Sequence, residues 1–398
     1  MPGRRRATKK RHPRRISRSS GSGQPDFALM IVIGFLLTFG WVMVYSSSVI
    51  VAFSQDRTPW FYFLRQLMWI TAGLIVGYFL YRFDYKKLPK LAPILISTAI
   101  ILLLMVLLVG VNINGSQRWI RLPFFDFQPS EFAKLAFVIY LASWLSRKRV
   151  TTKYKNQLTN YFLVEMLPFL LVLGTVLVLI LVEPDLGTTG IIGLVAISMY
   201  FIAGSGLAHN IGMSILIIFT GLVGTLAAVL ETYRLERIKT YISVIQSGLP
   251  ENRYGSGYQL SQVLIAVGSG GFDGLGFGQS KQKFNYLGET AFSDTIFAVI
   301  AEEFGFIGSL IVISAFLYIS IRGLKIAKGA PDKLSTLLAA GVTIWISLQA
   351  FLNIAANVGL IPLTGIPLPF ISYGGSSMII TLAGVGLLLN VSRYAKLD

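Results

Sequence analysis

The 398-residue sequence has no cysteine, only two histidines and few charged residues, which make up 13% of the chain. The lack of cysteine excludes disulfides, thiolate catalysis and cysteine-ligated zinc. With His12 and His209 as the only histidines, a Ser-His-Asp triad or a multi-histidine metal site is disfavoured. Soluble domains average about 25% charged residues. The low charge and the hydrophobic content of 54% therefore indicate a membrane protein.

Positive charge is concentrated at the N-terminus. The net charge is +17, and residues 1–26 hold a dense run of arginine and lysine against a single acid, Asp26. This stretch is rich in Ser, Gly and Pro and has no apolar run, so we expect a disordered cytoplasmic arm that touches anionic lipid. A partner-docking tail is the alternative. A nucleic-acid arm is disfavoured, and no nucleic-acid partner is predicted.

Hydropathy predicts ten membrane-spanning helices. A bilayer core of ~30 Å requires ~20 apolar residues in helical form. The predicted spans are 27–53, 67–82, 91–111, 129–146, 162–182, 187–204, 210–230, 294–321, 335–360 and 376–392. We therefore expect an all-α polytopic membrane protein, with one membrane domain over residues 27–394 and a short cytoplasmic tail at 395–398.

The charges of the connections predict the orientation. Basic residues cluster in every second connection, whereas the opposite short loops carry few and residues 361–375 carry no charge. The positive-inside rule then places both termini in the cytoplasm. The one long connection, residues 231–293 between the seventh and eighth spans, is predicted to be extracytoplasmic. Its basic residues do not contradict this, because long loops cross the membrane regardless of charge.

Ionisable residues near the outer ends of the spans are candidate functional residues, because charge inside a bilayer is costly. The first outer loop supplies Arg118, Trp119 and Arg121, and the fourth span begins with Glu131 and Lys134. The last two are three residues apart and share a helix face. They predict either a self-satisfied pair in the membrane or a lysine that faces an outer cavity and meets an anion.

The segment "VEPDLGTTG" places Glu183 and Asp185 at the outer end of the fifth span. Two carboxylates in a short turn with proline and glycine predict a buried polar corner. A structural hydrogen-bonding role is favoured for them, and direct contact with a ligand is the alternative.

The long loop contains an apolar stretch, residues 259–267, that is too short to span and predicts a re-entrant or interfacial helix. A glycine-rich run follows at residues 268–278, and Lys281 and Lys283 come directly after it. Glycines allow a backbone to approach a ligand closely. The run therefore predicts either a mobile loop or a cradle for an anionic ligand.

Carboxylates also mark the start of the eighth span, in the stretch "GETAFSDTIFAVIAEEFG". Asp294 follows Ser293 at the helix start, where either residue suits an N-cap. Glu302 lies about 12 Å deeper, at ~1.5 Å per residue, and must be protonated, paired or facing water. Because the outer face holds no histidine, a general base acting there would be aspartate or glutamate.

Five segments, taken together, resemble the SEDS family of polytopic peptidoglycan glycosyltransferases. They are "GSQRWIRL…FQPSEFAKLAF", "EPDLGTTG", "GYQLSQVLIAVGSGG", "SDTIFAVIAEEFGFIG" and "NVGLIPLTGIPLPFISYGGSS". The resemblance runs from Phe27 to Tyr394. The segments "VYSSS", "RWIRL" and "GLLLNVSR" are more similar to the FtsW-type division branch of the family than to the RodA-type elongation branch. The approach "GETAFSD" departs from the family, with Phe292 at a frequent histidine position and Thr295 in place of an aromatic.

The resemblance implies a polymerase of lipid II, an undecaprenyl-pyrophosphate-linked disaccharide-pentapeptide, on the outer face of the bacterial cytoplasmic membrane. It implies the growing glycan strand as co-substrate, and a class B penicillin-binding protein and other division proteins as partners at the division site. The essential aspartate of the family matches Asp294, its tryptophan in the first outer loop matches Trp119, and its helix-start lysine matches Lys134.

These assignments lead to a mechanism of inverting glycosyl transfer with Asp294 as the general base. Positive charge is needed at the leaving pyrophosphate, for which we expect Lys134, Arg118 and Arg121 first, and Lys281 and Lys283 next. Structural roles are expected for Glu131, Glu183, Asp185 and Glu302. No metal site is predicted. A divalent cation beside the pyrophosphate stays open, because carboxylates suit it but no motif shows it.

Two further classes of function compete with this one. A lipid II flippase or other transporter would use the many spans and the charges within them, but it should also place polar residues along a path to both faces. A non-catalytic scaffold would use the basic arm, but it gives no reason for a charged outer pocket. An elongation polymerase is the alternative within the family.

Overall fold

The computed structural model describes residues 23–113, 116–123, 125–147, 161–204, 207–229, 232–247 and 257–397, and the predicted arm lies mostly outside these ranges. Helices occupy all ten predicted spans: α1 (Phe27–Ser54), α2 (Phe61–Arg82), α3 (Leu88–Val109), α4 (Pro129–Ser146), α6 (Leu167–Val182), α7 (Leu186–Ala203), α8 (Leu207–Val229), α12 (Ile296–Gly329), α13 (Lys333–Asn357) and α14 (Gly375–Ser392). Short helical turns precede α3 and α6, namely η1 (Tyr85–Lys87) and η2 (Tyr161–Met166).

Among the described residues, nine helices are long and apolar enough to cross a membrane. The helix α4 is not among the nine, and it carries Glu131 and Lys134 in its first two turns. A multi-pass helical membrane protein is thereby confirmed, whereas the count of ten spans stays a prediction.

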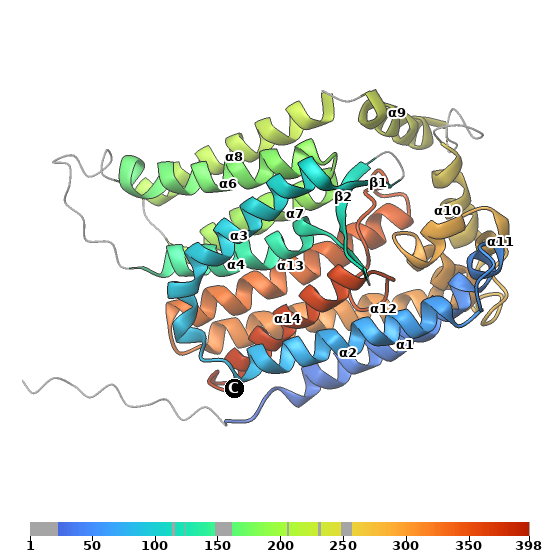
Figure 1. The fold of residues 1–398 in the computed structure, drawn as a ribbon, viewed down its shortest axis with the longest axis horizontal. Helices are drawn as coiled ribbons and strands as arrows, with labels where there is room; N and C mark the ends of the chain where they lie inside the picture. The colour runs from blue at the N-terminus through green and yellow to red at the C-terminus, as the bar shows by residue number, and fades with distance from the viewer. Residues whose placement is uncertain are drawn as a thin grey trace, which may run out of the picture.

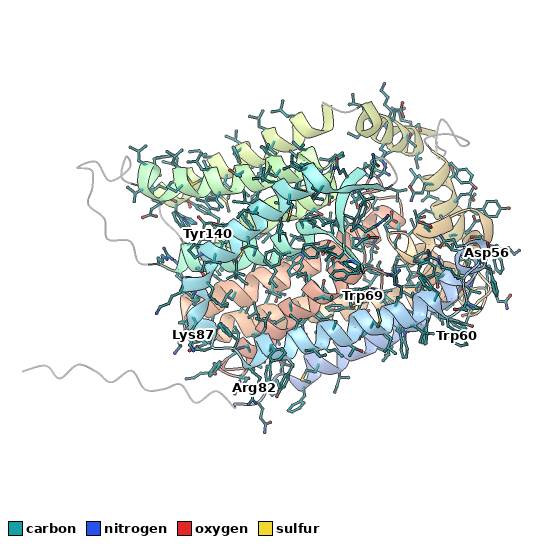
Figure 2. All side chains as sticks on the ribbon, in the orientation of Figure 1. Asp56, Trp60, Trp69, Arg82, Lys87 and Tyr140 are labelled. Carbon is teal, nitrogen blue, oxygen red and sulfur yellow. The ribbon has the colours of Figure 1, made fainter. Side chains whose placement is uncertain are left out.

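The long helices run side by side, and their connections gather at two ends of the bundle (Figure 1). At one end the N–H of Gly23 donates to the carbonyl of Arg393 at 3.2 Å, so the first and last described segments meet. Arg82 and Lys87 lie at this end, and Trp60 lies at the opposite end (Figure 2). The predicted orientation makes the first end cytoplasmic, and we call the other the outer end.

Most of the helical structure of the long connection gathers at the outer end (Figure 1). It consists of α9 (Thr232–Ser247), α10 (Tyr258–Ser269), α11 (Gln282–Asn285) and the 3-10 turn η3 (Gly288–Phe292). The apolar stretch 259–267 is helical as expected, because it forms most of α10.

The core of the bundle centres on α13, which packs against α4, α7, α12 and α14. Trp345 of α13 is the largest fully buried side chain. Small residues bring α2 and α14 into close contact, since a Cβ at Gly386 would lie 2.1 Å from the carbonyl of Gly77. Such contact between small residues is typical of helix packing in membranes, where dispersion rather than water exclusion drives association.

The first outer loop adds a small sheet to the helical fold. It forms a small antiparallel sheet in the order β1-β2-β3, made of β1 (Val111–Ile113), β2 (Ser116–Arg121) and β3 (Asp126–Phe127). Only segments within the hydrocarbon core must satisfy their backbone within a helix or closed barrel, so a short sheet is allowed outside it. Trp119 lies in β2, opposite Val111.

The helix α12 is kinked at Gly305, where φ is 62° and ψ is −157°. The glycine-rich segment 270–276 lies against this kink. The N–H groups of Leu275 and Gly276 donate to two consecutive carbonyls of α12 at 2.9 and 3.0 Å. A Cβ at Gly274 would lie 2.2 Å from the carbonyl of Glu303. Glycine at this position therefore allows close backbone packing against α12. This role differs from both sequence-based alternatives, a mobile loop and a ligand cradle.

Candidate active site

Asp294 lies at the outer end of the bundle, between η3 and α12. The N-cap of α12 is Thr295, which makes no side-chain cap, so neither Asp294 nor Ser293, the two residues that suit an N-cap by their sequence position, caps this helix. The chain turns at Ser293, where φ is −109° and ψ is −102°, before the helix begins. The carboxylate of Asp294 instead accepts a hydrogen bond from the Ser293 hydroxyl at 2.9 Å.

The backbone carbonyl of Asp294 is held by two asparagines of α13. It accepts the side-chain amides of Asn353 at 2.7 Å and of Asn357 at 3.0 Å. Asn353 also donates to the carbonyl of Ile366, at 2.7 Å, in the connection between α13 and α14. Both asparagines are almost fully buried, and neither was predicted as a site residue.

The surroundings of Asp294 favour a carboxyl that holds its proton more tightly than usual. Desolvation raises the pKa of Asp294, while the hydrogen bond from Ser293, the positive charge of Arg237 and a hydrogen bond from Gln259 act against the rise. Arg237 belongs to α9 and donates to the carbonyl of Leu363 at 2.7 Å. A raised pKa brings a carboxylate closer to the range in which it acts as a general base at neutral pH.

Lys134 is paired rather than open. Its ammonium group donates to Glu131 at 2.7 Å and to the side-chain oxygen of Gln349, on α13, also at 2.7 Å. The side chains of Lys134 and Glu131 are 1% and 2% exposed. Of the two arrangements that the sequence left open, the structure therefore has the self-satisfied pair, which joins α4 to α13.

Glu183 and Asp185 form the predicted buried corner together with Arg118. The guanidinium of Arg118 donates to the backbone carbonyl of Glu183 at 2.9 Å and to that of Pro184. Asp185 caps α7 by accepting the N–H of Thr188 at 3.0 Å. Arg118 thus fastens the sheet to the turn between α6 and α7.

The Glu183 carboxyl is unusual within this corner. It is 0% exposed, and both of its oxygens lack a hydrogen-bond partner among the described residues. Burial raises the pKa of Glu183 to about 9, and the charge of Asp185 adds to the rise while that of Arg118 opposes it. At neutral pH the group is therefore a protonated acid.

Glu302 and Glu303 tie α12 to the long connection. Glu302 accepts the Ser280 hydroxyl at 2.5 Å and the N–H of Lys281 at 3.0 Å, just before α11. Glu303 forms a buried ion pair with Lys283 at 2.6 Å. The ammonium group of Lys283 is therefore committed to a carboxylate, whereas the side chain of Lys281 is exposed.

The remaining predicted residues lie in the sheet. Arg121 pairs with Asp126 at 3.2 Å, and both side chains are well exposed, at 62% and 41%. Trp119 is half-buried in the same strand. Within the described ranges, no group of three or more His, Asp or Glu residues is placed to hold a metal ion.

The site residues that sequence reasoning missed share one pattern. Gln349, Asn353 and Asn357 are spaced four residues apart within an apolar span and form one polar stripe on α13. Within this stripe Gln349 binds Lys134, and the other two residues bind the carbonyl of Asp294. Their helical spacing inside a predicted apolar span is the sequence feature by which these polar residues could have been predicted.

Sequence comparison finds relatives over most of the chain. The model of the FtsW/RodA/SpoVE family, described as cell cycle protein, matches residues 27–397. Stage V sporulation protein E of Bacillus subtilis (strain 168) is 40% identical over 375 residues, or 94% of this chain and 98% of that protein. A probable peptidoglycan glycosyltransferase FtsW of Nitrosomonas europaea is 37% identical over 384 residues, covering 94% of this chain and 95% of that protein.

Solved structures share the fold. The rod shape determining protein RodA of Thermus thermophilus aligns with a TM-score of 0.64 at 25% identity, over 97% of this chain and 100% of that one. A structure described as structural coordination of polymerization and crosslinking by a peptidoglycan synthase complex aligns with a TM-score of 0.71 at 27% identity, over 93% and 98%.

Proposed function

The chain belongs to the FtsW/RodA/SpoVE family of cell cycle proteins, and from that membership we propose that it polymerises lipid II with Asp294 as general base. The enzyme is a peptidoglycan glycosyltransferase, like the FtsW proteins that it resembles. The observation that carries the proposal for Asp294 is the position of its half-buried carboxyl at the outer end, where burial raises its pKa and the charge of Arg237 opposes the rise.

The reaction requires one proton transfer and one displacement. The acceptor sugar hydroxyl attacks the anomeric carbon of the donor, the bond from that carbon to the pyrophosphate oxygen breaks, and the lipid pyrophosphate leaves. Asp294 takes the hydroxyl proton. A single displacement of this kind inverts the anomeric centre and needs no nucleophilic carboxylate, by analogy with inverting glycosidases.

Cations are needed where negative charge develops on the leaving pyrophosphate. Lys134 and Lys283 are already bound to buried carboxylates, and Arg118 holds two backbone carbonyls. We therefore assign the pyrophosphate to Lys281, whose side chain is exposed. Lys134 and Lys283 then serve to fix α4, α12 and α13 around the site.

The same premise leads to the cellular setting. A multi-pass chain of this family is a protein of the bacterial cytoplasmic membrane, and we place its work at the division site with the growing glycan strand as co-substrate. A class B penicillin-binding protein is the proposed partner. Support comes from the structural neighbour, which is described as coordinating polymerization and crosslinking in a peptidoglycan synthase complex. Other division proteins and anionic lipid complete the proposed contacts.

The test is polymerisation of lipid II by the purified protein together with a class B partner that has no transglycosylase activity. Asp294→Asn should lower the turnover by at least about 100-fold, the lower range for loss of a general base. Asp273→Asn makes the same substitution at an exposed aspartate of the long connection and should leave turnover unchanged. A folded Asp294→Asn protein that polymerises at the wild-type rate refutes the assignment. Flipping of labelled lipid II that survives this substitution would instead favour a transporter.

A further inference from the structure

We infer that Asn353 and Ser372 are positioning residues for Asp294, because they hold the two peptide groups on either side of its Cα. The inference rests on the proposed role of Asp294 and deepens it. Neither residue needs to touch substrate, and each acts only through the backbone of the aspartate.

The first peptide group is the one between Ser293 and Asp294. Its carbonyl, which belongs to Ser293, accepts the hydroxyl of Ser372 at 2.5 Å. The same hydroxyl accepts the N–H of Leu368 at 2.7 Å, so it is held from both sides. Ser372 is 4% exposed and has little freedom to move.

The second peptide group is the one between Asp294 and Thr295. Its carbonyl, which belongs to Asp294, accepts the amides of Asn353 and Asn357. Because Thr295 is the N-cap of α12, Asp294 lies just outside the helix, and helical bonding begins with the carbonyl of Thr295. The carbonyl of Asp294 therefore takes no part in α12 and is bound by α13.

Holding both groups restricts the direction in which the side chain leaves the backbone. Peptide groups are planar, so hydrogen bonds to the carbonyls on both sides of Asp294 restrict its two backbone dihedrals and hence the direction of its Cα–Cβ bond. A catalytic group displaced by about 1 Å can lose roughly 100-fold in rate. Among the described residues, the side-chain partners of the Asp294 carboxylate are the Ser293 hydroxyl and Gln259, and the backbone anchors add to the orientation that these two give.

The anchors come from the buried centre of the bundle. Asn353 lies on the central helix α13, is 1% exposed, and uses its amide to bridge Asp294 and Ile366. The connection that holds Ser372 is bonded in turn to α13, because Gln349 donates to the carbonyl of Pro367 at 3.0 Å. Asp294 is thus held to α13 directly, by Asn353 and Asn357, and indirectly, through Ser372 and the connection that Gln349 binds.

The experiment compares Asn353→Ala with Asn390→Ala in lipid II polymerisation, with the full chain and its class B partner. Asn390 is the matched control, since it is also 1% exposed and its amide also bridges two backbone carbonyls, those of Leu80 and Phe83, at the cytoplasmic end. Both variants should lose similar thermal stability. Asn353→Ala should lower kcat by at least about tenfold with KM unchanged, whereas Asn390→Ala should keep the wild-type kcat.

Ser372 supplies an independent test that does not depend on the folding of the asparagine variant. Ser372→Ala removes the hydroxyl and should lower kcat at constant KM, and Ser372→Thr keeps the hydroxyl and should restore it. The inference is overturned if the wild type polymerises lipid II and both Asn353→Ala and Ser372→Ala retain its kcat, or if they change KM alone. Failure of the underlying proposal looks different, because Asp294→Asn would then remain active.

Discussion

Replacement of Glu183 by glutamine should stabilise the protein, and increasingly so as the pH rises. Glu183 is fully buried in the corner between α6 and α7, with both carboxyl oxygens unpartnered among the described residues. Its pKa is raised to about 9, from 4.5 for an ordinary glutamate. Between these two values the folded protein keeps a proton that the unfolded chain releases, so the free energy of unfolding falls as the pH rises.

The size of the effect follows from the two pKa values. Each pH unit between them costs about 1.4 kcal/mol. At pH 7, which is 2.5 units above 4.5, the cost of keeping Glu183 protonated is therefore about 3 kcal/mol. Glutamine has nearly the same shape and carries no proton to release, so the variant should lose this cost and the pH dependence that goes with it.

The assay is thermal unfolding in detergent, followed by tryptophan fluorescence between pH 5 and pH 9. Wild type and Glu183→Gln should unfold at similar temperatures near pH 5, and the gap should widen steadily above it. Glu289→Gln is the control, because it makes the same substitution at an exposed glutamate of η3. Parallel curves for wild type and Glu183→Gln across this pH range would refute the assignment of a buried, protonated carboxyl.

Two further predictions concern the charges around the site. Lys134→Met leaves Glu131 buried without its cation and should cost about 3 kcal/mol of stability. The double variant Glu131→Gln with Lys134→Met should recover most of this loss. Equal thermal destabilisation of the single and double variants would contradict the ion pair. Arg237→Gln removes a charge that lowers the pKa of Asp294, so the acid limb of kcat/KM should move to higher pH, because the base must be ionised to act. An acid limb that stays in place would show that Arg237 does not act on the base.

The positions of the helices were predictable because hydropathy alone decides which segments avoid water. All ten predicted spans coincide with helices, and the predicted short helix in the long connection coincides with α10. The sheet of the first outer loop was not predicted, since β1 and β3 are three and two residues long and carry no periodic signal.

The candidate site was predictable only in part. The position of Asp294 beside a membrane helix was readable from the chain, but its anchors were not, because Asn353 lies 59 residues away in sequence. The lysines show the same limit. The sequence left the Glu131–Lys134 pair as one of two arrangements, and it gave no sign that Glu303 neutralises Lys283, so the fold was needed for both.

The contact between α1 and α12 has a consequence for biosynthesis. Ser46 of α1 donates to Glu303 at 2.8 Å, across 257 residues of chain. At a translation rate of ~5–20 residues per second, the partner of this first span emerges roughly 13 to 50 s after the span itself. During that interval Ser46 lacks the carboxylate that it bonds in the finished fold. The last third of the protein must therefore be made before its first helix is fully enclosed.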